Sequence, residues 1–296
     1  MFARRHPYLF TLMVLSALAC LGLVAISLAA FAVSDSERLT FGPRVGLVEI
    51  SGVISDSTFV VNSLERFAAN PDIKAVLLRV DSPGGAIGPS QEIFTQVEKT
   101  AAKKPVVASF GSVAASGGYY ASAPATGIMA NPGTITGSIG VILSYTNIEG
   151  LFDKVGLKPV VIKSGRYKDM GSPFRDITET ERELFEEAVM DLYRQFVKDV
   201  AHGRQMELAA VEALADGRIF TGSQALELGL VDKIGNLRDA LEWAAELGGI
   251  EGEIAVQPAR KKGFSLLEEL LQLSSEMTRS LHQRTANGFA FLWSMD

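Results

Sequence analysis

The chain has 296 residues, of which 47% are hydrophobic and 21% charged, with a formal net charge of −6 at pH 7. This composition excludes a disordered chain, and the acidic balance lacks the basic footprint of nucleic-acid-binding proteins. The single cysteine, Cys20, excludes an intrachain disulfide, and a mean hydropathy of +0.20 excludes a membrane protein with several spans.

The first predicted element is an apolar helix close to the N-terminus. Residues 8–33 form a stretch of 26 positions without Asp, Glu, Lys, Arg or His. About 20 apolar residues span a bilayer as a helix, whereas a secretory signal has an apolar region of only about 7–15 residues. Arg4 and Arg5 precede the stretch. The positive-inside rule then predicts a single-pass anchor, with residues 1–7 in the cytoplasm and the rest of the chain outside.

Two processing events stand as alternatives to a retained anchor. Residues 30–32, Ala-Phe-Ala, resemble the small-x-small site at which signal peptides are cleaved. Cys20 follows an Ala-Leu-Ala segment that faintly resembles a lipoprotein processing site, but the apolar stretch continues past it. We favour the retained anchor, with the Cys20 thiol unreactive in lipid or against a partner helix.

After a polar linker at 34–44, the hydrophobic pattern predicts strands that alternate with helices. Near-continuous apolar runs are typical of strands covered on both faces, so we expect an α/β domain at 45–252 with a mostly parallel sheet. Thr178 and Glu181 fit a capping box at the start of the longest helix. The predicted strands are 45–54, 74–80, 105–110, 126–130, 139–143 and 159–163. The predicted helices are 62–69, 89–102, 114–125, 148–155, 178–203, 207–215, 221–229 and 236–248.

The tail at 253–296 departs from this alternation. Six apolar side chains between Phe264 and Leu273 fall on one face of a predicted amphipathic helix. Such a helix either lies against a partner subunit or the membrane surface, or completes the core of the domain. Both interpretations stay open from the sequence.

Common catalytic and metal motifs are absent from the sequence. It has no G-x-x-x-x-G-K-[ST] loop and no H-E-x-x-H helix, and beyond the anchor it has no cysteine and only His202 and His282. A zinc site with the usual ligands therefore lacks donors, and we expect neither a metal nor a cofactor. His202 lies beside Gly203 at a helix end and His282 lies in the tail, so we expect neither in a Ser-His-Asp triad.

Ser116 is the candidate nucleophile. It lies between small residues in the segment 111–120, GSVAASGGYY, after a buried-type strand and at a predicted helix start. The amide of Gly117 at that helix start could donate to a developing oxyanion. The segment 81–85, DSPGG, follows another strand and could bring a second amide to the same end of the sheet. A Ser-Gly-Gly sequence alone is more often explained by tight helix–sheet packing than by catalysis.

A serine nucleophile without a suitable histidine needs another base. A lysine whose pKa is lowered by burial is the known alternative. Lys154 and Lys158 flank a predicted surface helix, whereas Lys163 and Lys168 bound the turn-rich beginning of the segment 163–175. Composition does not choose between Lys163 and Lys168.

The segments together resemble the signal peptide peptidase A (protease IV) family of serine proteases. The resemblance covers about residues 45–247 and implies a Clp-protease/crotonase-like domain. It also implies Ser116 as nucleophile, Lys168 as general base and the amides of Gly85 and Gly117 as the oxyanion hole. Ser164 would either orient the lysine or serve only the turn. The matching segments are 81–85, 114–120, 136–141 (TGSIGV), 164–169 (SGRYKD), 215–218 (ADGR) and 229–232 (GLVD).

The resemblance further implies where the protein acts and on what. It implies a membrane-anchored endopeptidase that degrades remnant signal peptides at the extracytoplasmic, periplasmic face of a bacterial inner membrane. Short single-domain members form homo-oligomeric rings, in which the placement of Ser and Lys depends on subunit contacts. Since signal peptides are apolar, we expect a preference for apolar or small side chains beside the cleaved bond. Nothing in the sequence indicates a nucleic-acid partner.

Two other functions compete with this interpretation. A crotonase-type enzyme would bind an acyl-CoA and use Glu or Asp, and would need neither Ser116 nor Lys168. A membrane-tethered oligomeric scaffold with a decayed site would need no catalytic residue, yet every expected catalytic position is present.

Overall fold

The computed structural model describes residues 6–36, 42–260 and 289–292. The chain divides into two compact units, Met1–Pro43 and Arg44–Asp296. The first unit contains α2 (Pro7–Ser36), a helix of 30 residues. Across the residues that the structure describes, no helix combines the length and the apolarity that a membrane crossing requires.

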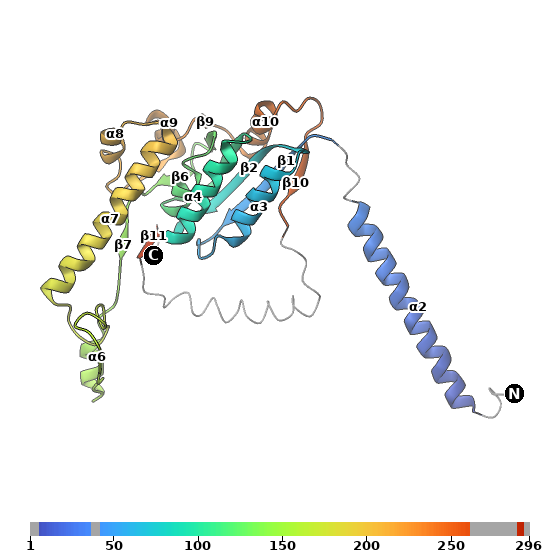
Figure 1. Cartoon of the computed structure of the whole chain (residues 1–296), viewed down its shortest axis with the longest axis horizontal. Helices are drawn as coiled ribbons and strands as arrows, with labels where there is room; N and C mark the ends of the chain where they lie inside the picture. The colour runs from blue at the N-terminus through green and yellow to red at the C-terminus, as the bar shows by residue number, and fades with distance from the viewer. Residues whose placement is uncertain (1–5, 37–41, 261–288, 293–296) are drawn as a thin grey trace. The chain divides into compact units, whose positions relative to one another are not determined.

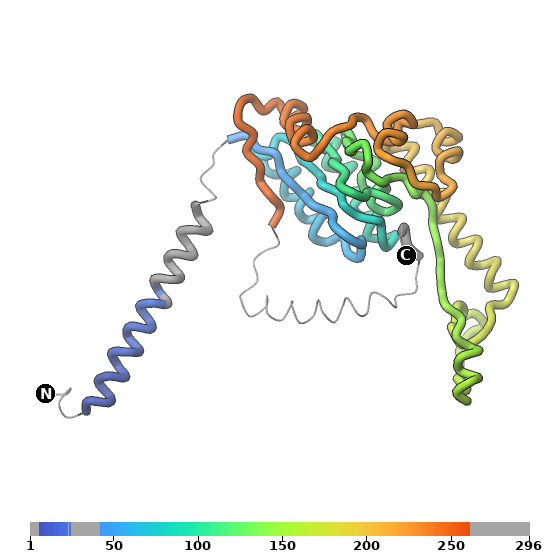
Figure 2. Tube along the Cα trace, turned by 180° about the vertical axis from the view of Figure 1, so that it is seen from behind, coloured from blue at the N-terminus to red at the C-terminus, as the bar shows by residue number. Residues whose placement is uncertain are grey.

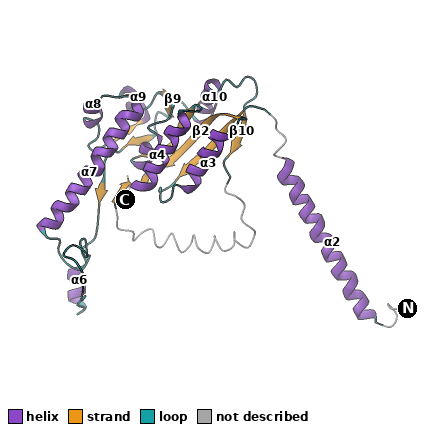
Figure 3. Ribbon diagram, viewed as in Figure 1, coloured by secondary structure: helices purple, strands orange, loops and turns teal. Residues whose placement is uncertain are grey.

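The second unit is built on a mostly parallel sheet, so the α/β prediction is confirmed (Figure 3). The strands run in the spatial order β10-β1-β2-β4-β5-β9, and each neighbouring pair is parallel. Beyond this row, β6 pairs in parallel with β4, and β8 pairs antiparallel with β6. The bounds are β1 (Arg44–Ser51), β2 (Ile73–Ser82), β4 (Val106–Ala115), β5 (Gly127–Ala130), β6 (Ile135–Gly137), β8 (Ile219–Thr221), β9 (Lys233–Ile234) and β10 (Ala255–Pro258).

Helices cover both faces of the sheet, which explains why its central strands are apolar almost throughout. In β2, Leu78 and Val80 face the larger core, which the helices α3, α4, α5 and α7 complete, whereas Leu77 faces a smaller core that α10 completes. Figure 1 shows α3 and α4 side by side over the sheet. Successive strand residues point to opposite faces, so a strand buried on both has no polar alternation. The helices are α3 (Thr58–Ala69), α4 (Ile87–Ala101), α5 (Gly117–Ser122), α7 (Glu179–Arg204), α8 (Leu208–Glu212), α9 (Gly222–Glu227) and α10 (Leu237–Leu247).

Two predicted boundaries near the candidate nucleophile were wrong. The strand predicted to end at 110 continues as β4 to Ala115, because its second half pairs with β6. The segment 81–85, predicted as a loop, contains the end of β2 and a further strand, β3 (Gly84–Ala86). Gly and Pro lowered the local strand propensity, but neighbouring strands supply the backbone partners that decide the outcome.

A long arm leaves the sheet after β6 and returns along α7. It contains β7 (Ile142–Leu143), α6 (Glu149–Lys154) and the segment up to residue 178, and it projects from the body in both views (Figures 1 and 2). The strand predicted at 159–163 has no regular structure here. Val160 is 85% exposed and Ile162 96%, so β-branched residues alone do not make a strand without a neighbour.

The C-terminal strand β11 (Phe289–Leu292) lies between the arm and the body. It pairs antiparallel with β3 on one side and with β7 on the other, with Phe291 opposite Gly85 and Ala290 opposite Ile142. A segment from the end of the chain therefore occupies the space beside the DSPGG sequence. The predicted amphipathic helix around Phe264–Leu273 lies outside the described residues.

Candidate active site

Ser116 occupies a strained position between the end of β4 and the first residue of α5. Its φ is 52° and its ψ is −118°, a left-handed φ that favours glycine over other residues. The amide of Ser116 donates to the carbonyl of Gly137 (2.8 Å), and its own carbonyl accepts from the amide of Tyr120 (2.8 Å). The backbone is thus fixed by β6 on one side and by the helix on the other.

The hydroxyl of Ser116 is buried and has no hydrogen-bond partner. The residue is 1% exposed, and its Oγ is among the few buried side-chain atoms of the described residues that lack a partner. A buried polar atom without a partner costs free energy, and in native proteins such atoms concentrate at functional sites. Backbone strain together with an unpaired hydroxyl on one serine is typical of a nucleophile in the absence of its base and substrate.

Two tyrosines hold α5, the short helix that starts at Ser116. The Tyr119 hydroxyl donates to the carbonyl of Leu230 (2.9 Å), and the Tyr120 hydroxyl donates to the carboxylate of Asp199 on α7. Burial raises the pKa of both phenols, so both act as neutral donors. A six-residue helix is unstable alone, so these anchors and the core fix the position of Ser116.

The two predicted oxyanion donors lie on elements that pack against each other. Gly117 is the first residue of α5, and Gly118 fits so closely that an added Cβ would lie 2.9 Å from the carbonyl oxygen of Ser82. Gly85 is buried in β3, where an added Cβ would lie 2.1 Å from the carbonyl oxygen of Ile54. The end of β2 therefore reaches the start of α5, and glycine is required at position 85.

Ser138 is a site neighbour that sequence reasoning did not single out. It follows Gly137, the partner of the Ser116 amide, and it is buried with a left-handed φ of 51°. Its amide donates to the carbonyl of Arg218 (2.8 Å), which holds the turn. The TGSIGV segment entered the sequence analysis only through the resemblance, because a left-handed serine has no signal in composition or periodicity.

Lys168 lies on the arm and is exposed, as is Ser164. Its backbone amide closes a turn with the carbonyl of Gly165 (3.2 Å), but among the described residues no hydrogen bond or ion pair holds its amine. Since the Ser116 hydroxyl has no partner, the two predicted catalytic side chains are not hydrogen-bonded in the described chain. The burial that a lysine base requires is not supplied by this arrangement.

Lys163, the other candidate base, has its amine committed elsewhere. It forms an ion pair with the carboxylate of Asp169 and donates to the carbonyl of Arg166 (3.0 Å). To turn toward another side chain, this amine would have to give up the bonds to the carboxylate and the carbonyl. The two candidate lysines thus differ in the described chain, because the Lys163 amine is bonded and the Lys168 amine is not, a difference that composition did not show.

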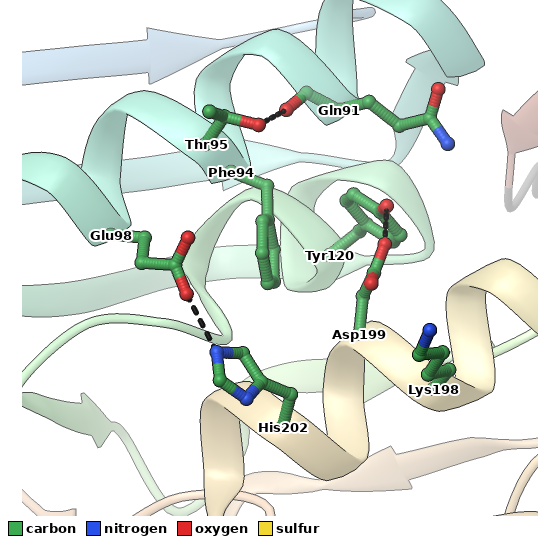
Figure 4. A pocket seen from close by; sticks show the side chains of 8 residues that line it. All are labelled: Gln91, Phe94, Thr95, Glu98, Tyr120, Lys198, Asp199 and His202. Atoms are coloured by element: carbon green, nitrogen blue, oxygen red, sulfur yellow. Dashed lines mark hydrogen bonds and ion pairs between the residues drawn. The ribbon is translucent and has the colours of Figure 1, made fainter.

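Side chains of α4, α5 and α7 line a cavity of about 450 Å³ (Figure 4), and Ser116 is not among the residues that line it. At its edge the Nε2 atom of His202 lies 2.7 Å from a carboxylate oxygen of Glu98, which ties α7 to α4. His202 is thus paired with Glu98 and not with Ser116. Within the described part of the chain, no group of three or more His, Cys, Asp or Glu side chains is placed to hold a metal ion. The cavity is lined by Gln91, Phe94, Thr95, Glu98, Tyr120, Lys198, Asp199 and His202.

Comparison with known proteins decides the family. The profile of Peptidase family S49 matches residues 98–251, about half of the chain. The chain belongs to peptidase family S49. It is 47% identical over 210 residues to "Putative protease slr0021" of Synechocystis sp., an alignment that covers 70% of this chain and 76% of that one.

Two further relatives carry names of the same kind. "Putative signal peptide peptidase SppA" of Enterococcus faecium is 46% identical over 185 residues, which cover 62% of this chain and 53% of the relative. "Protease 4" of Haemophilus influenzae is 32% identical over 240 residues, which cover 77% of this chain and 39% of the relative. This S49 peptidase is therefore a serine peptidase of the signal peptide peptidase A type, and it spans about half or less of these two relatives.

Proposed function

We propose that the protein is a membrane-anchored endopeptidase that degrades cleaved signal peptides with a Ser116–Lys168 dyad. One observation carries the proposal: Ser116 has a buried, unpartnered hydroxyl on a strained backbone at the start of α5. A structural serine in tight helix–sheet packing would have a relaxed φ or a bonded hydroxyl. Membership of peptidase family S49 supports peptide-bond hydrolysis as the reaction in which this serine would act.

The chemistry follows from the residues in these places. The Ser116 Oγ attacks a peptide carbonyl while the neutral Lys168 amine takes its proton, and the amides of Gly85 and Gly117 hold the oxyanion. The lysine then gives the proton to the leaving amine, which breaks the peptide bond and leaves an acyl-serine. Water attacks the acyl-serine with Lys168 as the base, which releases the new carboxylate and restores both side chains.

The exposed position of Lys168 is the reason to propose a homo-oligomer. The arm that carries it exposes several large apolar side chains, among them Leu151, Val155, Val160 and Ile162. Large apolar side chains exposed close together along one segment favour an interface between chains. We propose that the arm of one copy packs on a second copy, so that Lys168 loses its water and meets a Ser116 hydroxyl.

The place of β11 supports an extended, apolar substrate. A strand between β3 and β7 hydrogen-bonds on both edges and passes Gly85, a proposed oxyanion donor. The segment that lies there reads Phe-Ala-Phe-Leu, and apolar and small residues also fill the cores of signal peptides. We propose that substrates take this place with their backbones antiparallel to β3 and β7.

The membrane anchor rests on the sequence of the first unit. Residues 8–33 carry no charge, and α2 (Pro7–Ser36) makes them helical. We place the catalytic domain on the extracytoplasmic face of a bacterial inner membrane, where released signal peptides remain in the bilayer. Membranes washed at alkaline pH test this, since an anchored chain stays with the lipid until detergent is added.

A fluorophosphonate probe tests the function, because it reacts with an activated serine. The full-length protein in detergent should become labelled and should cleave a Leu- and Ala-rich peptide, and Ser116→Ala should abolish both. Absence of labelling in a folded, oligomeric protein overturns the proposal and favours a scaffold. Equal cleavage of charged and apolar peptides overturns the substrate preference alone.

A further inference from the structure

The segment that carries Lys168 is held by charged side chains rather than by a hydrophobic core. Turn hydrogen bonds precede and follow the lysine: its own amide bonds the carbonyl of Gly165, and that of Met170 bonds the carbonyl of Tyr167 (3.1 Å). The next helix back, α6, has no buried residue. The position of the lysine must therefore come from elsewhere.

Asp169, the neighbour of Lys168, is the point to which the segment is tied. Its carboxylate accepts from the Nε of Arg175 (3.2 Å) and from the amine of Lys163, and its carbonyl accepts from the Nη2 of Arg175 (3.1 Å). Hydrogen bonds from Arg175, and then from Lys163, lower the pKa of Asp169 to about 2. The carboxylate stays ionised at any pH at which a lysine could act as a base.

Arg175 joins this point to the first turn of α7. Its Nη1 and Nη2 donate to the two carboxylate oxygens of Glu181, at 2.8 and 2.6 Å, which is a bidentate pair. Glu181 is 3% exposed and completes the capping box with Thr178, whose amide donates to the same carboxylate (3.0 Å). The predicted capping box is confirmed, and it fixes the carboxylate to which Arg175 binds.

The helix α7 in turn is fixed to the body of the domain. Its second half packs in the main core through Phe196, Val197 and Val200. A continuous path of bonds thus runs from the core along α7 to Glu181, from there to Arg175, and from Arg175 to the residue beside Lys168.

We infer that Arg175 is a positioning residue that aims the Lys168 amine by locking Asp169 to the start of α7. The inference rests on the proposed Ser116–Lys168 mechanism. A guanidinium is required because it serves two carboxylates and the carbonyls of Asp169 and Asp176 at fixed angles, which one ammonium group cannot do. The aim matters because a displacement of about 1 Å in a catalytic group costs roughly 100-fold in rate.

The test compares substitutions in full-length protein. Arg175→Gln removes the charge and the fork, Arg175→Lys keeps the charge alone, and Arg194→Gln is the matched control, because Arg194 forms an exposed pair with Asp191 on the same helix. We expect Arg175→Gln to lower kcat and the labelling rate about 10- to 100-fold with KM changed less than about threefold. Arg175→Lys should lie between, and Arg194→Gln should match the unmodified protein.

Melting temperature and oligomer size, measured on the same samples, separate aiming from folding. If Arg175→Gln fails to assemble, Asp169→Asn provides the second variant, since it leaves the Arg175–Glu181 pair in place, and it should show the same loss of kcat. Normal kcat in a folded Arg175→Gln or Asp169→Asn protein overturns the inference.

Lys168→Ala, measured in parallel, distinguishes failure of the positioning role of Arg175 from failure of the Ser116–Lys168 dyad. If it is inactive while Arg175→Gln is normal, the positioning role alone fails. If Lys168→Ala keeps normal turnover, the dyad fails and the inference fails with it.

Discussion

The two halves of the proposed dyad lie in regions of opposite construction. Around Ser116 every residue of α5 is buried, and the aromatic rings of Phe94 and Phe196 pack on Tyr120 at centroid distances of 5.2 and 4.8 Å. Around Lys168 the chain is exposed and is held by ion pairs among its own side chains and by the pair of Arg175 with Glu181 on α7. The nucleophile is thus placed by packing and the base by electrostatics. Substitutions around Ser116 should therefore lower stability, whereas substitutions around Lys168 should change activity alone.

The largest effect that tests this contrast is expected at the lysine. Lys168→Ala should lower kcat by about 10²–10⁴-fold, the usual loss for a general base, with an unchanged melting temperature. Lys163→Ala should cost much less, because the Lys163 amine bonds Asp169 and the carbonyl of Arg166, and Arg175 still holds Asp169 without it. Steady-state kinetics and thermal melts on both variants decide. Should Lys163→Ala prove the more damaging of the two, the assignment of the base would be reversed.

On the packed side, Gly85→Ala should damage both activity and stability. The new methyl group would overlap the carbonyl of Ile54 and displace β3, and loss of one oxyanion donor costs about 10²–10³-fold in kcat. Gly88→Ala is the matched control, because a Cβ at Gly88 meets nothing within 4 Å and alanine favours the helix α4. The contrast between the regions breaks if Gly85→Ala melts like Gly88→Ala.

The strand β11 pairs with β3 on the body and with β7 on the arm, in the place that we propose for the substrate. Its removal should therefore change activity alone. A chain that ends at Arg260 lacks the segment between β3 and β7, and we expect peptide cleavage to rise several-fold through a lower KM. Progress curves with a Leu-rich peptide measure this. A change of Phe291 to Asp in the full chain should act in the same direction, and unchanged KM in both variants would argue against this groove as the substrate site.

A smaller effect on stability should distinguish two tyrosines. Tyr120→Phe removes the hydroxyl that donates to Asp199 in the core, and we expect a loss of about 1–3 kcal/mol in the free energy of unfolding. Tyr167→Phe, on the exposed segment before Lys168, should change it by less than about 0.5 kcal/mol. Denaturant titrations of both variants compare them, and equal losses would show that the arm is as firmly packed as the core.

The smallest expected change is in the stability of the protein at acid pH. Asp169 and Glu181 each have a pKa of about 2, below the values of about 3.9 and 4.3 for unfolded chains, because both accept from Arg175. Their contribution to stability is therefore complete above the unfolded values and is lost as the pH falls through about 2. Carboxyl carbon NMR should find both groups ionised at about pH 4. In the Arg175→Gln variant both midpoints should move up toward ordinary values.

The sequence predicted the layered α/β fold and the capping box, because these depend on local periodicity and on one pair of side chains. It missed β3 and β6 and misplaced the start of α5, because glycine and serine take their conformation there from strands that lie elsewhere in the chain. The bond that occupies the Lys163 amine depends on the position of Asp169, which no spacing rule provides. The strain at Ser116 is likewise visible only in its φ.

The exposed segment at 159–163 has a consequence for the assembly of newly folded copies. Its backbone has no strand partner in the described part of the chain and its valine and isoleucine side chains face solvent, the combination that lets an exposed edge bind another chain. A newly folded copy would then be most exposed to unwanted pairing before it meets other copies of the protein. Confinement of all copies to one plane by their proposed anchors would shorten that search, since tethering raises the effective concentration of each copy around its neighbours.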